Sequence, residues 1–528
     1  MSQDAIDPTE LACALRVLEQ AGALDPTHPD SVTLQHAVSK LFKAVKRSRR
    51  NAAKQRIRQA DRQVLAATAT AHPRRIDDET AGLLISPNKA LANSHTPGAV
   101  ATPYGFAGKL HRPQNCYICK QPYTLVDSFH HQLCPTCAAD NHARREARVD
   151  LTGRRALLTG GRAKIGMYIA LKLLRDGCDV TITTRFPRDA VRRFTAIADA
   201  DTFLDRLHVI GVDLRDPRQV VAVARKVASA GPLDILINNA AQTVRRLPGA
   251  YSGLVDAEQA PLAGKESEVD LTIFGSTSHL HPHHLVGDGT PGQALTAGTP
   301  SETAAQAGHE LSVETGNEEA ANSTTRRAQE QIQASRLAAL AMTGGAADLA
   351  RVDNGTAIDA GGLIPDLVDH NSWVATIGQV DAVEMLEVQL CNATAPFILI
   401  DQLRPALEAS PARRKYIVNV SAMEGVFSRG YKGPGHPHTN MAKAALNMLT
   451  RTSAQELFEH GILMTAVDTG WITDERPHTT KARLAQEGFH APLDLVDGAA
   501  RVYDPIVQGE NGVDLYGCFL KDYKPSPW

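Results

Sequence analysis

Four cysteines in two closely spaced pairs are the clearest set of metal-ligand residues in this chain. Cys116 and Cys119 form one CxxC pair and Cys134 and Cys137 form the second, with 14 residues between the pairs. Two such pairs can bring four thiolates to the corners of a tetrahedron, the geometry that Zn²⁺ prefers in structural sites. Four sulfur ligands leave no open position for water, so the spacing predicts a structural zinc rather than a catalytic one.

Three histidines, His130, His131 and His142, lie beside the cysteine pairs. Imidazole is also a common zinc ligand, so His131 is an alternative to one of the cysteines, although we expect it at the protein surface. The segment 113–148 ends shortly before the next structured unit begins. We therefore expect this zinc knuckle to pack on that unit rather than to act as a free binding module.

A glycine-rich turn supplies a second kind of chemistry, the binding of phosphate groups. Residues 157–175 read LLTGGRAKIGMYIALKLLR, in which a short strand runs into a turn and then into an amphipathic helix that starts near Ile165. Backbone N–H groups at such a helix start face a pyrophosphate, with the positive end of the helix dipole behind them. Gly160 and Gly166 fit this turn, whereas Lys164 stands where a third glycine is expected.

Further landmarks follow the turn in a fixed order along the chain. They are Asp213 in VIGVDLRD, Asn239 in LDILINNAA, Asn392 in CNATAPF, Ser421 in YIVNVSAMEG, Lys443 in HTNMAKAALNMLT and Thr473 in VDTGWIT. Together with the turn they resemble the short-chain dehydrogenase/reductase family over about 151–245 and 370–528. The resemblance implies a doubly wound parallel Rossmann sheet, an α/β fold, and hydride transfer between a nicotinamide cofactor and a carbonyl or alcohol substrate.

The resemblance also implies which residues hold the cofactor. They are Thr159, Gly160, Arg162, Lys164, Ile165, Gly166, Arg185, Asp213, Asn239, Lys443 and Thr473. The second strand, CDVTITTRF, ends in Arg185. An acidic residue there would bind the ribose 2′-hydroxyl of NAD, whereas an arginine accommodates the 2′-phosphate of NADP. Arg162 and Lys164 add two cations beside it, so we predict NADP rather than NAD.

The catalytic positions implied by the resemblance are only partly filled. Lys443 and Asn392 are present, but Thr439 stands in the place of the family's tyrosine, and the serine position aligns with Ala422, one residue after Ser421. An alkyl hydroxyl has a pKa far above that of a phenol, so Thr439 is a poor proton donor.

Two interpretations of this departure stay open. The Gly- and Pro-rich loop VFSRGYKGPGHPH carries Tyr431, His436 and His438, and could bring one of them into the vacant place. A histidine titrates near neutrality and would suit proton transfer. Alternatively, the chain binds NADP without catalysing the standard reaction, as a sensor or scaffold for a protein or nucleic-acid partner.

The N-terminal region, residues 1–70, carries two helical patterns. Asp7 precedes the first, and the second runs from Ser31 to about Ala67 with a strongly basic middle in which Asp61 is the one acid. This stretch could contact nucleic acid or an anionic surface. The lack of interleaved aromatic residues favours instead a solvated helix, which would pack through Leu34, Val38, Leu41, Phe42 and Val45. Residues 71–112, rich in Pro, Ala, Thr and Gly, predict a linker.

A long insertion separates two landmarks that the family joins by one short helical connection. Asn239 and Asn392 lie 153 positions apart, and about 255–350 is mostly small, polar residues. Such a composition buries too little apolar surface to offset the entropy of ordering, so we expect disorder, with a helix over Thr324–Met342. The run His279–His284 is expected to be a solvated tract rather than a metal site.

Composition sets the remaining limits. With 528 residues and 43% hydrophobic content, the chain can build a large core over 151–528 in addition to the smaller N-terminal units. A net charge of −2 gives no global attraction to nucleic acid. We find no apolar run of membrane-spanning length, no signal-peptide pattern and no disulfide-rich composition, so we expect a cytoplasmic protein. The resemblance implies a homodimer or tetramer, and the apolar stripe of LNMLTRTSAQELF would suit such an interface. The substrate is expected to be a small molecule that the sequence does not identify.

Overall fold

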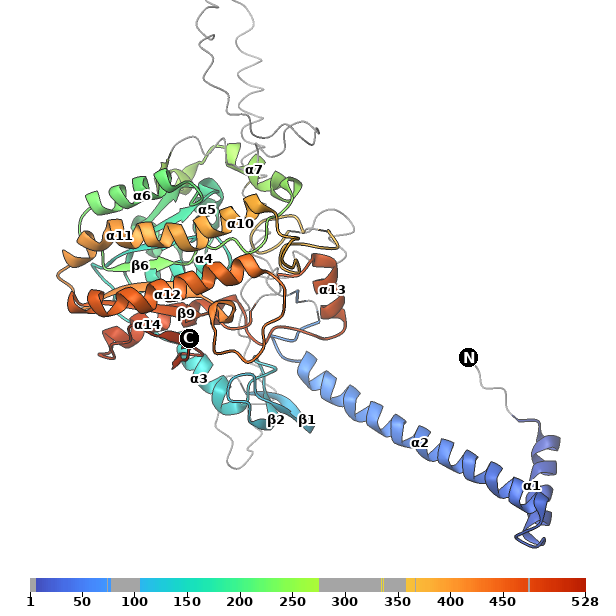
Figure 1. Ribbon diagram of the computed structural model, residues 1–528. Coiled ribbons are helices and arrows are strands. Elements are labelled where there is room, and N and C mark those ends of the chain that lie inside the picture. Colours follow the sequence, from blue (N-terminus) through green and yellow to red (C-terminus); the bar gives the residue numbers. More distant parts are fainter. Residues whose placement is uncertain are drawn as a thin grey trace, which may run out of the picture.

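The computed structural model describes residues 6–73, 75–76, 105–274, 334, 336, 358–365, 367–472 and 475–528. Figure 1 shows two N-terminal helices, a small unit of two strands and a helix, and a large body around one sheet. The helices are α1 (Pro8–Gly22) and α2 (Pro29–Ala66). The Asp7 side chain accepts hydrogen bonds from the first N–H groups of α1, which satisfies donors that a helix start leaves free. Both predicted helices are confirmed.

The cysteine-bearing unit is a hairpin followed by a helix. Strands β1 (Phe106–Asn115) and β2 (Pro122–Asp127) are antiparallel, and α3 (Pro135–Glu146) follows them. Residues 106–112 therefore belong to this unit, and the sequence-based linker boundary at 112 is wrong. The unit begins before the first cysteine because the hairpin needs a strand on each side of the turn; residues 77–104 of the expected linker lie outside the described part of the chain.

The large body is built on a sheet of nine strands in the order β11-β10-β9-β8-β6-β3-β4-β5-β7. All pairs are parallel except β10 with β11. The strands are β3 (Arg155–Thr159), β4 (Asp179–Thr184), β5 (Leu207–Gly211), β6 (Ile235–Asn238), β7 (Asp270–Ile273), β8 (Lys415–Ser421), β9 (Ile462–Asp468), β10 (Phe519–Lys521) and β11 (Lys524–Ser526). The chain starts at the centre of the sheet and winds outward in both directions, so the predicted doubly wound α/β fold is confirmed.

Helices cover both faces of this sheet and bury two apolar clusters. One face carries α4 (Lys164–Arg175), α5 (Pro187–Thr195) and α14 (Leu495–Glu510), and the other carries α6 (Pro217–Ser229), α11 (Ala395–Glu408) and α12 (Pro437–Glu459) (Figure 1). The expectation of no apolar run of membrane-spanning length is wrong for one stretch of the described chain, Ala382–Glu408, which is long and apolar enough to cross a membrane. Its leucines at 399, 403 and 407 are buried in the second cluster, as expected for a core helix.

The start of the insertion, expected to be disordered from about residue 255, is ordered as far as residue 274. Helix α7 (Ser252–Gln259) extends into the span 255–350, and the edge strand β7 lies inside it. Leu254 and Val255 pack against Phe186 of the body, and Ala257 is buried. Ala334 and Arg336, the described residues of the helix expected over Thr324–Met342, are helical. The run His279–His284 lies outside the described residues.

The N-terminal helices project from the body instead of packing on it. Leu41 and Phe42, expected to anchor α2, are 65% and 66% exposed. Only the last turns of α2 make contact, through Val64 and Leu65, which join the core of the cysteine-bearing unit. The expectation that α2 packs through Leu34, Val38, Leu41, Phe42 and Val45 is therefore wrong for the last four, which are exposed.

Candidate dinucleotide site and cysteine cluster

The glycine turn is held by close backbone contact between the ends of β3 and β6. A Cβ atom on Gly160 would lie 2.9 Å from the Cα of Ala240, and one on Gly166 would lie 2.0 Å from the carbonyl oxygen of Gly160. Asn239 donates from Nδ2 to the carbonyl oxygens of Thr159 and Gly160, at 3.0 and 3.1 Å. The Thr159 hydroxyl oxygen accepts from the backbone of Asn239 and Ala240. Thr159 and Asn239 thus shape the turn.

Lys164 occupies a backbone conformation that normally favours glycine. Its φ is +52°, in the left-handed region, where a side chain carries a steric cost of about 1–2 kcal/mol. The Lys164 ammonium nitrogen lies 3.7 Å from the buried carboxylate of Asp359. Asp359 in turn accepts hydrogen bonds from the backbone of Gly361 and Leu363. The segment that follows the insertion is therefore joined to the turn by this lysine.

A cavity of about 390 Å³ opens at the carboxyl ends of β3, β4, β5 and β6. Parallel α/β sheets bind ligands at this edge, where neighbouring helices cross over in opposite directions. Of the sequence-predicted cofactor residues, the cavity is lined by Gly160, Arg162, Lys164, Ile165, Gly166, Arg185, Asp213 and Asn239. Thr473 lies outside the described residues, and Thr159 and Lys443 lie behind the cavity wall.

The charged groups around the cavity differ in how far they are already neutralised. The Arg162 guanidinium lies 2.5 Å from the Asp189 carboxylate, which also binds Arg193. Asp213 holds Arg215 at 2.6 Å. Burial would raise the pKa of Asp213, but the hydrogen bond and charge of Arg215 lower it, so this carboxylate stays ionised. Arg162 and Asp213 are thus engaged with protein partners.

Arg185 stands apart from these pairs. It lines the cavity half-buried, with its guanidinium 5.8 Å from the ring centre of Phe186 and 5.6 Å from that of Tyr251. No carboxylate pairs with it among the residues that the structure describes. Phe186, Tyr251 and the partners Asp189 and Asp359 were missed by sequence reasoning; Phe186 was findable as the immediate neighbour of Arg185, whereas the others join the site only through the fold.

Four of the predicted catalytic residues, Asn392, Lys443, Ser421 and Thr439, are buried. Asn392, in a π-helical turn (Leu390–Thr394), accepts from the backbone N–H of Gln242 at 2.7 Å and donates to its carbonyl oxygen at 2.9 Å. Lys443 donates to the carbonyl oxygen of Val420 at 2.8 Å, and burial lowers its pKa to about 8. Ser421 donates to the Asn447 side chain at 2.5 Å. Asn392 therefore positions the loop after β6.

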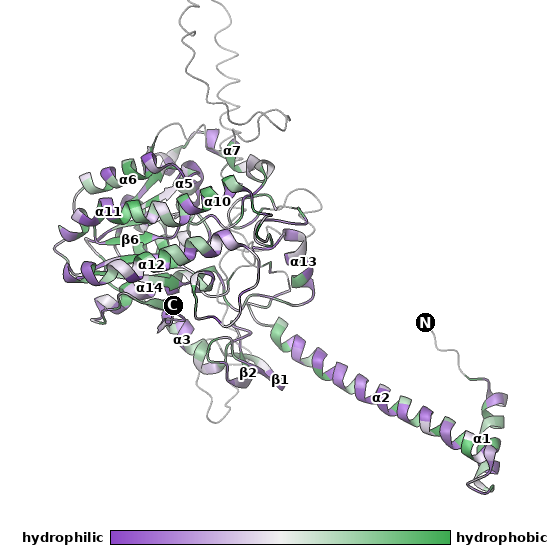
Figure 2. Cartoon of the chain, in the orientation of Figure 1, coloured by the Kyte–Doolittle hydropathy of each residue, from purple (hydrophilic) through white to green (hydrophobic). Residues whose placement is uncertain are grey.

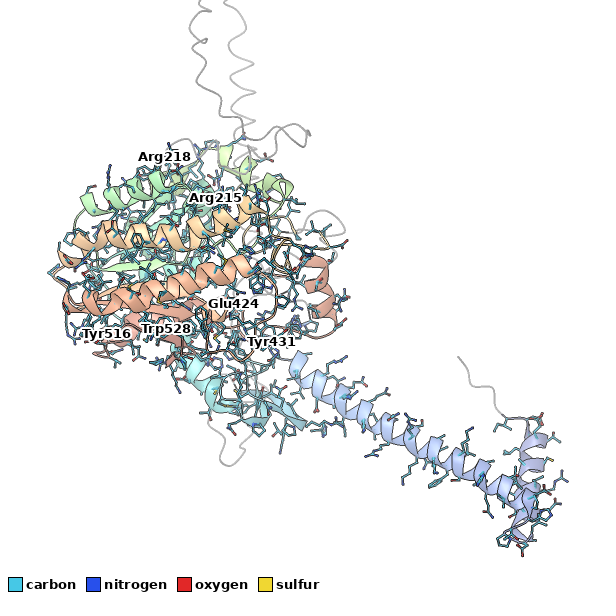
Figure 3. The ribbon with its side chains drawn as sticks, viewed as in Figure 1. Arg215, Arg218, Glu424, Tyr431, Tyr516 and Trp528 are labelled. Carbon is cyan, nitrogen blue, oxygen red and sulfur yellow. The ribbon has the colours of Figure 1, made fainter. Side chains whose placement is uncertain are left out.

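The Gly- and Pro-rich loop before α12 could have supplied a residue in place of the missing tyrosine. It does not bring Tyr431 inward. Its side chain is 75% exposed (Figure 3), so the assignment of Tyr431 to the active site is wrong. His436 stacks on Trp373 at 3.9 Å and donates to its carbonyl oxygen, so it is also engaged elsewhere. His438 and Thr439 are buried, and neither side chain has a hydrogen-bond partner within the described structure.

The four cysteines gather as their spacing predicted. All four Sγ atoms lie within 4.8 Å of one another, and those of Cys119 and Cys134 are 3.7 Å apart. A tetrahedron with Zn–S bonds of 2.3 Å has edges of about 3.8 Å, so these sulfurs fit a zinc ion. The backbone N–H of Cys134 donates to the Cys116 sulfur at 3.3 Å, which stabilises negative charge there. None of the eight cysteines forms a disulfide.

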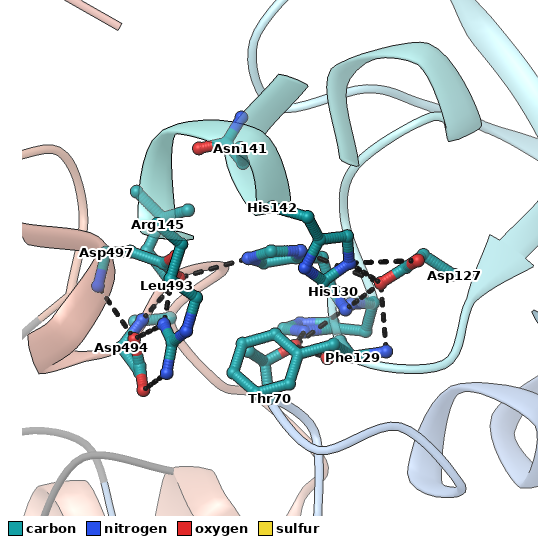
Figure 4. A network of polar contacts seen from close by, with 12 residues as sticks. Thr70, Asp127, Phe129, His130, Asn141, His142, Arg145, Leu493, Asp494 and Asp497 are labelled. Atoms are coloured by element: carbon teal, nitrogen blue, oxygen red, sulfur yellow. Dashed lines mark hydrogen bonds and ion pairs between the residues drawn. The ribbon is translucent and has the colours of Figure 1, made fainter. Parts of the chain in front are cut away.

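A buried polar network joins the cysteine-bearing unit to the large body (Figure 4). Arg145 binds Asp494 and Asp497 at 2.6 and 3.1 Å, and His130 binds Asp497 at 3.0 Å. On its other side His130 lies 3.6 Å from Asp127, which also binds His142. The predicted packing of the knuckle on the body is confirmed.

His131 corrects the expectation of a surface residue. It is 4% exposed, and its Nδ1 lies 2.8 Å from the Thr70 hydroxyl. The end of the α2 region, 61 positions earlier in the chain, covers it. His131 therefore ties the N-terminal segment to the knuckle and is not a member of the sulfur cluster.

Apolar contacts at the same boundary reach the glycine turn. Ile472 and Leu493 of the body are buried in the core of the cysteine-bearing unit, and Ile165 of the turn packs against that core. The Tyr117 hydroxyl accepts from the backbone N–H of Trp471 at 3.0 Å. The knuckle thus supports both the start of α4 and the segment that follows β9.

Comparison with known proteins agrees with this architecture. The sequence model described as short chain dehydrogenase matches residues 154–259. An uncharacterized protein, R665, of Acanthamoeba polyphaga mimivirus is 30% identical over 403 residues, which cover 74% of this chain and 71% of that one. The chain belongs to the short-chain dehydrogenase/reductase family.

Two further proteins are similar to this chain. One matches a shorter segment, and the other is a solved structure with lower sequence identity. A probable oxidoreductase of Streptomyces lividans is 42% identical over 92 residues, 17% of this chain and 30% of its own. The solved structure of NADPH-bound carbonyl reductase from chicken fatty liver is 17% identical and covers 72% of this chain and 100% of its own, with a TM-score of 0.40.

The sulfur cluster leads to a test of metal content. We expect purified protein to carry about one zinc per chain, and Cys116→Ser to lose it and unfold at lower temperature, because three thiolates cannot close the tetrahedron. Elemental analysis and thermal melts measure both effects. Cys13→Ser, at an exposed cysteine of α1, is the matched control and should keep its zinc. Wild-type protein without zinc, or Cys116→Ser with it, would contradict the assignment.

The buried His130 makes stability depend on pH. Burial alone would lower its pKa, but Asp497 and Asp127 raise it from 6.5 to about 9. The stabilisation is therefore present in full below pH 6.5 and is lost as the pH rises through about 9; its upper size is about 3 kcal/mol. We expect the stability difference between wild type and His130→Gln, measured by chemical denaturation, to shrink over that interval. His370→Gln, at an exposed histidine, should follow wild type throughout, and a pH-independent difference would refute this role of His130.

Proposed function

We propose that this protein is an NADP(H)-dependent oxidoreductase that transfers hydride between the nicotinamide ring and a carbonyl or alcohol carbon of a small substrate. The observation that carries the proposal is the Arg185 guanidinium, which lines the cavity at the glycine turn and has no carboxylate partner among the described residues. The family supplies the expectation of a dinucleotide, and the cavity supplies room for one at the edge of the sheet where such ligands bind.

The choice of NADP rests on charge. Arg185 follows β4, the strand next to the glycine turn, where the adenosine ribose is expected. An NAD site would present a carboxylate to the ribose hydroxyls at this position. Here the nearest acids are engaged, Asp213 by Arg215 and Asp189 by Arg162 and Arg193. Within the described structure the Arg185 guanidinium has no carboxylate partner and lies beside the stacked rings of Phe186 and Tyr251. Such a guanidinium suits a phosphate, which it can bind through two parallel hydrogen bonds.

The protein's own groups prepare the site in distinct ways. When bound, the nicotinamide supplies or accepts the hydride. Asn392 fixes the backbone of Gln242 and so the loop that lines the cavity wall. Burial lowers the pKa of Lys443 to about 8. This pKa is close enough to neutrality for Nζ to hold or release a proton. Thr439 and His438 are the buried groups near it that lack a partner, and they are our candidates for contact with the substrate oxygen.

Two features of the catalytic positions favour a second function. Tyr431 is at the surface, and Thr439 offers no acid with a pKa near neutrality. These features suit a protein that binds NADP(H) as a signal and transfers no hydride. Turnover of any carbonyl substrate at a rate above the uncatalysed reaction would exclude this alternative.

Cofactor preference tests the role of Arg185. We expect Arg185→Ala to weaken NADPH binding by about 10- to 100-fold, the effect of losing a charge-assisted phosphate contact of 1.5–3 kcal/mol, and to change NADH binding by less than about threefold. Nicotinamide fluorescence titrations measure both affinities. Arg218→Ala, at a 92% exposed arginine on α6 (Figure 3), is the control and should leave both unchanged. Equal losses for NADPH and NADH would overturn the assignment of the 2′-phosphate site.

Conservative substitutions test the proton-transfer groups. Once a substrate is found, we expect Tyr431→Phe to retain wild-type kcat/KM because its ring is at the surface. Thr439→Val and His438→Gln, which preserve approximate size, should separate the two buried candidates: loss of the acting group should lower kcat about 100-fold or more. Steady-state rates over pH 6–10 provide the readout. Loss of activity in Tyr431→Phe would contradict the outward position of that residue.

A further inference from the structure

Two exposed apolar seams run along the N-terminal helices. The seam of α1 consists of Leu11, Leu15 and Leu18, spaced four and three residues apart. The seam of α2 has the same alternating spacing and consists of Leu34, Val38, Leu41 and Val45. Such spacing places the side chains along one stripe of a helix, as in the seams through which helices of a bundle pack. Figure 2 shows apolar and polar residues alternating along both helices.

These seams lack a partner within the described chain. Helix α1 has no buried residue, and α2 has one, Ser31. Of the 25 large hydrophobic side chains that are exposed in the described structure, 11 lie between Ile6 and Val45. A 15-residue helix is marginal in water when nothing packs against it, so α1 needs a further contact to be stable.

The charges of the two helices are complementary. Helix α1 carries two acidic side chains, Glu10 and Glu19, and one basic, Arg16, with Asp7 at its N-cap, whereas residues 40–62 of α2 contain ten basic side chains and one acidic, Asp61. Two copies of the basic segment would repel each other, but the acidic α1 of one chain would be attracted to the basic α2 of another. No ion pair to the ten basic side chains forms within the described structure, so their charges are available to a partner.

We propose that the helices α1 and α2 associate two copies of this chain, with α1 of each copy packing along α2 of the other. The seams supply apolar burial and the opposite net charges set which helix meets which. A nucleic acid would neutralise the basic segment but would leave both apolar seams exposed to water. A second copy satisfies the seams and the charges together, and it does so independently of any cofactor chemistry.

Sedimentation of the full-length protein tests the apolar part. We expect the double variant Leu15→Asp with Leu41→Asp to have half the assembly mass of the wild type at a concentration of about 10 µM, well above the Kd expected of a stable dimer. Ile377→Asp, at an apolar residue of the body that is even more exposed, is the control and should retain the wild-type mass. Equal masses for the double variant and the wild type would overturn the proposal.

Charge reversal tests the pairing without touching the seams. One variant carries Lys40→Glu, Lys43→Glu, Lys46→Glu, Arg47→Glu, Arg50→Glu and Lys54→Glu, so that the basic segment of α2 becomes net acidic while α1 stays acidic. The other variant carries Glu10→Lys and Glu19→Lys, so that α1 becomes net basic like α2. Each alone should lose the assembly, and mixing the two should restore it, because only the mixed pair opposes acidic and basic helices. No recovery on mixing would refute the proposed pairing. A monomeric wild type that instead binds duplex DNA or RNA with steep salt dependence would assign the basic segment to nucleic acid and overturn the proposal.

Discussion

The close approach of the β3 and β6 ends at the glycine turn is the constraint on which the site depends. Gly160 and Gly166 have no room for a side chain, because the neighbouring backbone atoms lie within 3 Å of the position a Cβ would take. This contact sets the start of α4 and places Arg162, Lys164 and Ile165 around the cavity mouth. A bulkier turn would move the helix start away from the sheet edge and remove the phosphate position with it.

The same turn connects the cofactor site to the cysteine cluster. Ile165 packs on the core of the cysteine-bearing unit, where Ile472 and Leu493 are buried. The unit is held against the body by Arg145 and His130, both of which bind Asp497 at the start of α14. A structural metal in this position would act on the dinucleotide site through packing, since its four sulfurs lie outside the cavity.

Features set by local rules could be predicted from the sequence. The glycine turn, the strand and helix beside it, the α1 cap at Asp7 and the grouping of the four cysteines each follow from a short segment, and all were confirmed. The order of the landmarks also sufficed for the family and the doubly wound sheet. These properties depend on residues close in the chain or on a pattern repeated along it.

Features that depend on distant segments could not be predicted. His131 is buried because Thr70 covers it, and Lys164 meets Asp359 nearly 200 positions later. The loop sequence also does not reveal that Tyr431 points outward or that His436 stacks on Trp373. Likewise, β7 is a strand because β5 offers it an edge, although its surroundings have the composition of a disordered insertion.

The central claim is that the cavity at the glycine turn binds NADP(H). Isothermal titration of the wild-type protein with NADPH and, in parallel, NADH tests it most directly. We predict one dinucleotide-binding site per chain, with an affinity for NADPH at least tenfold higher than for NADH. No heat of binding for either dinucleotide, at protein concentrations up to about 100 µM, would contradict it.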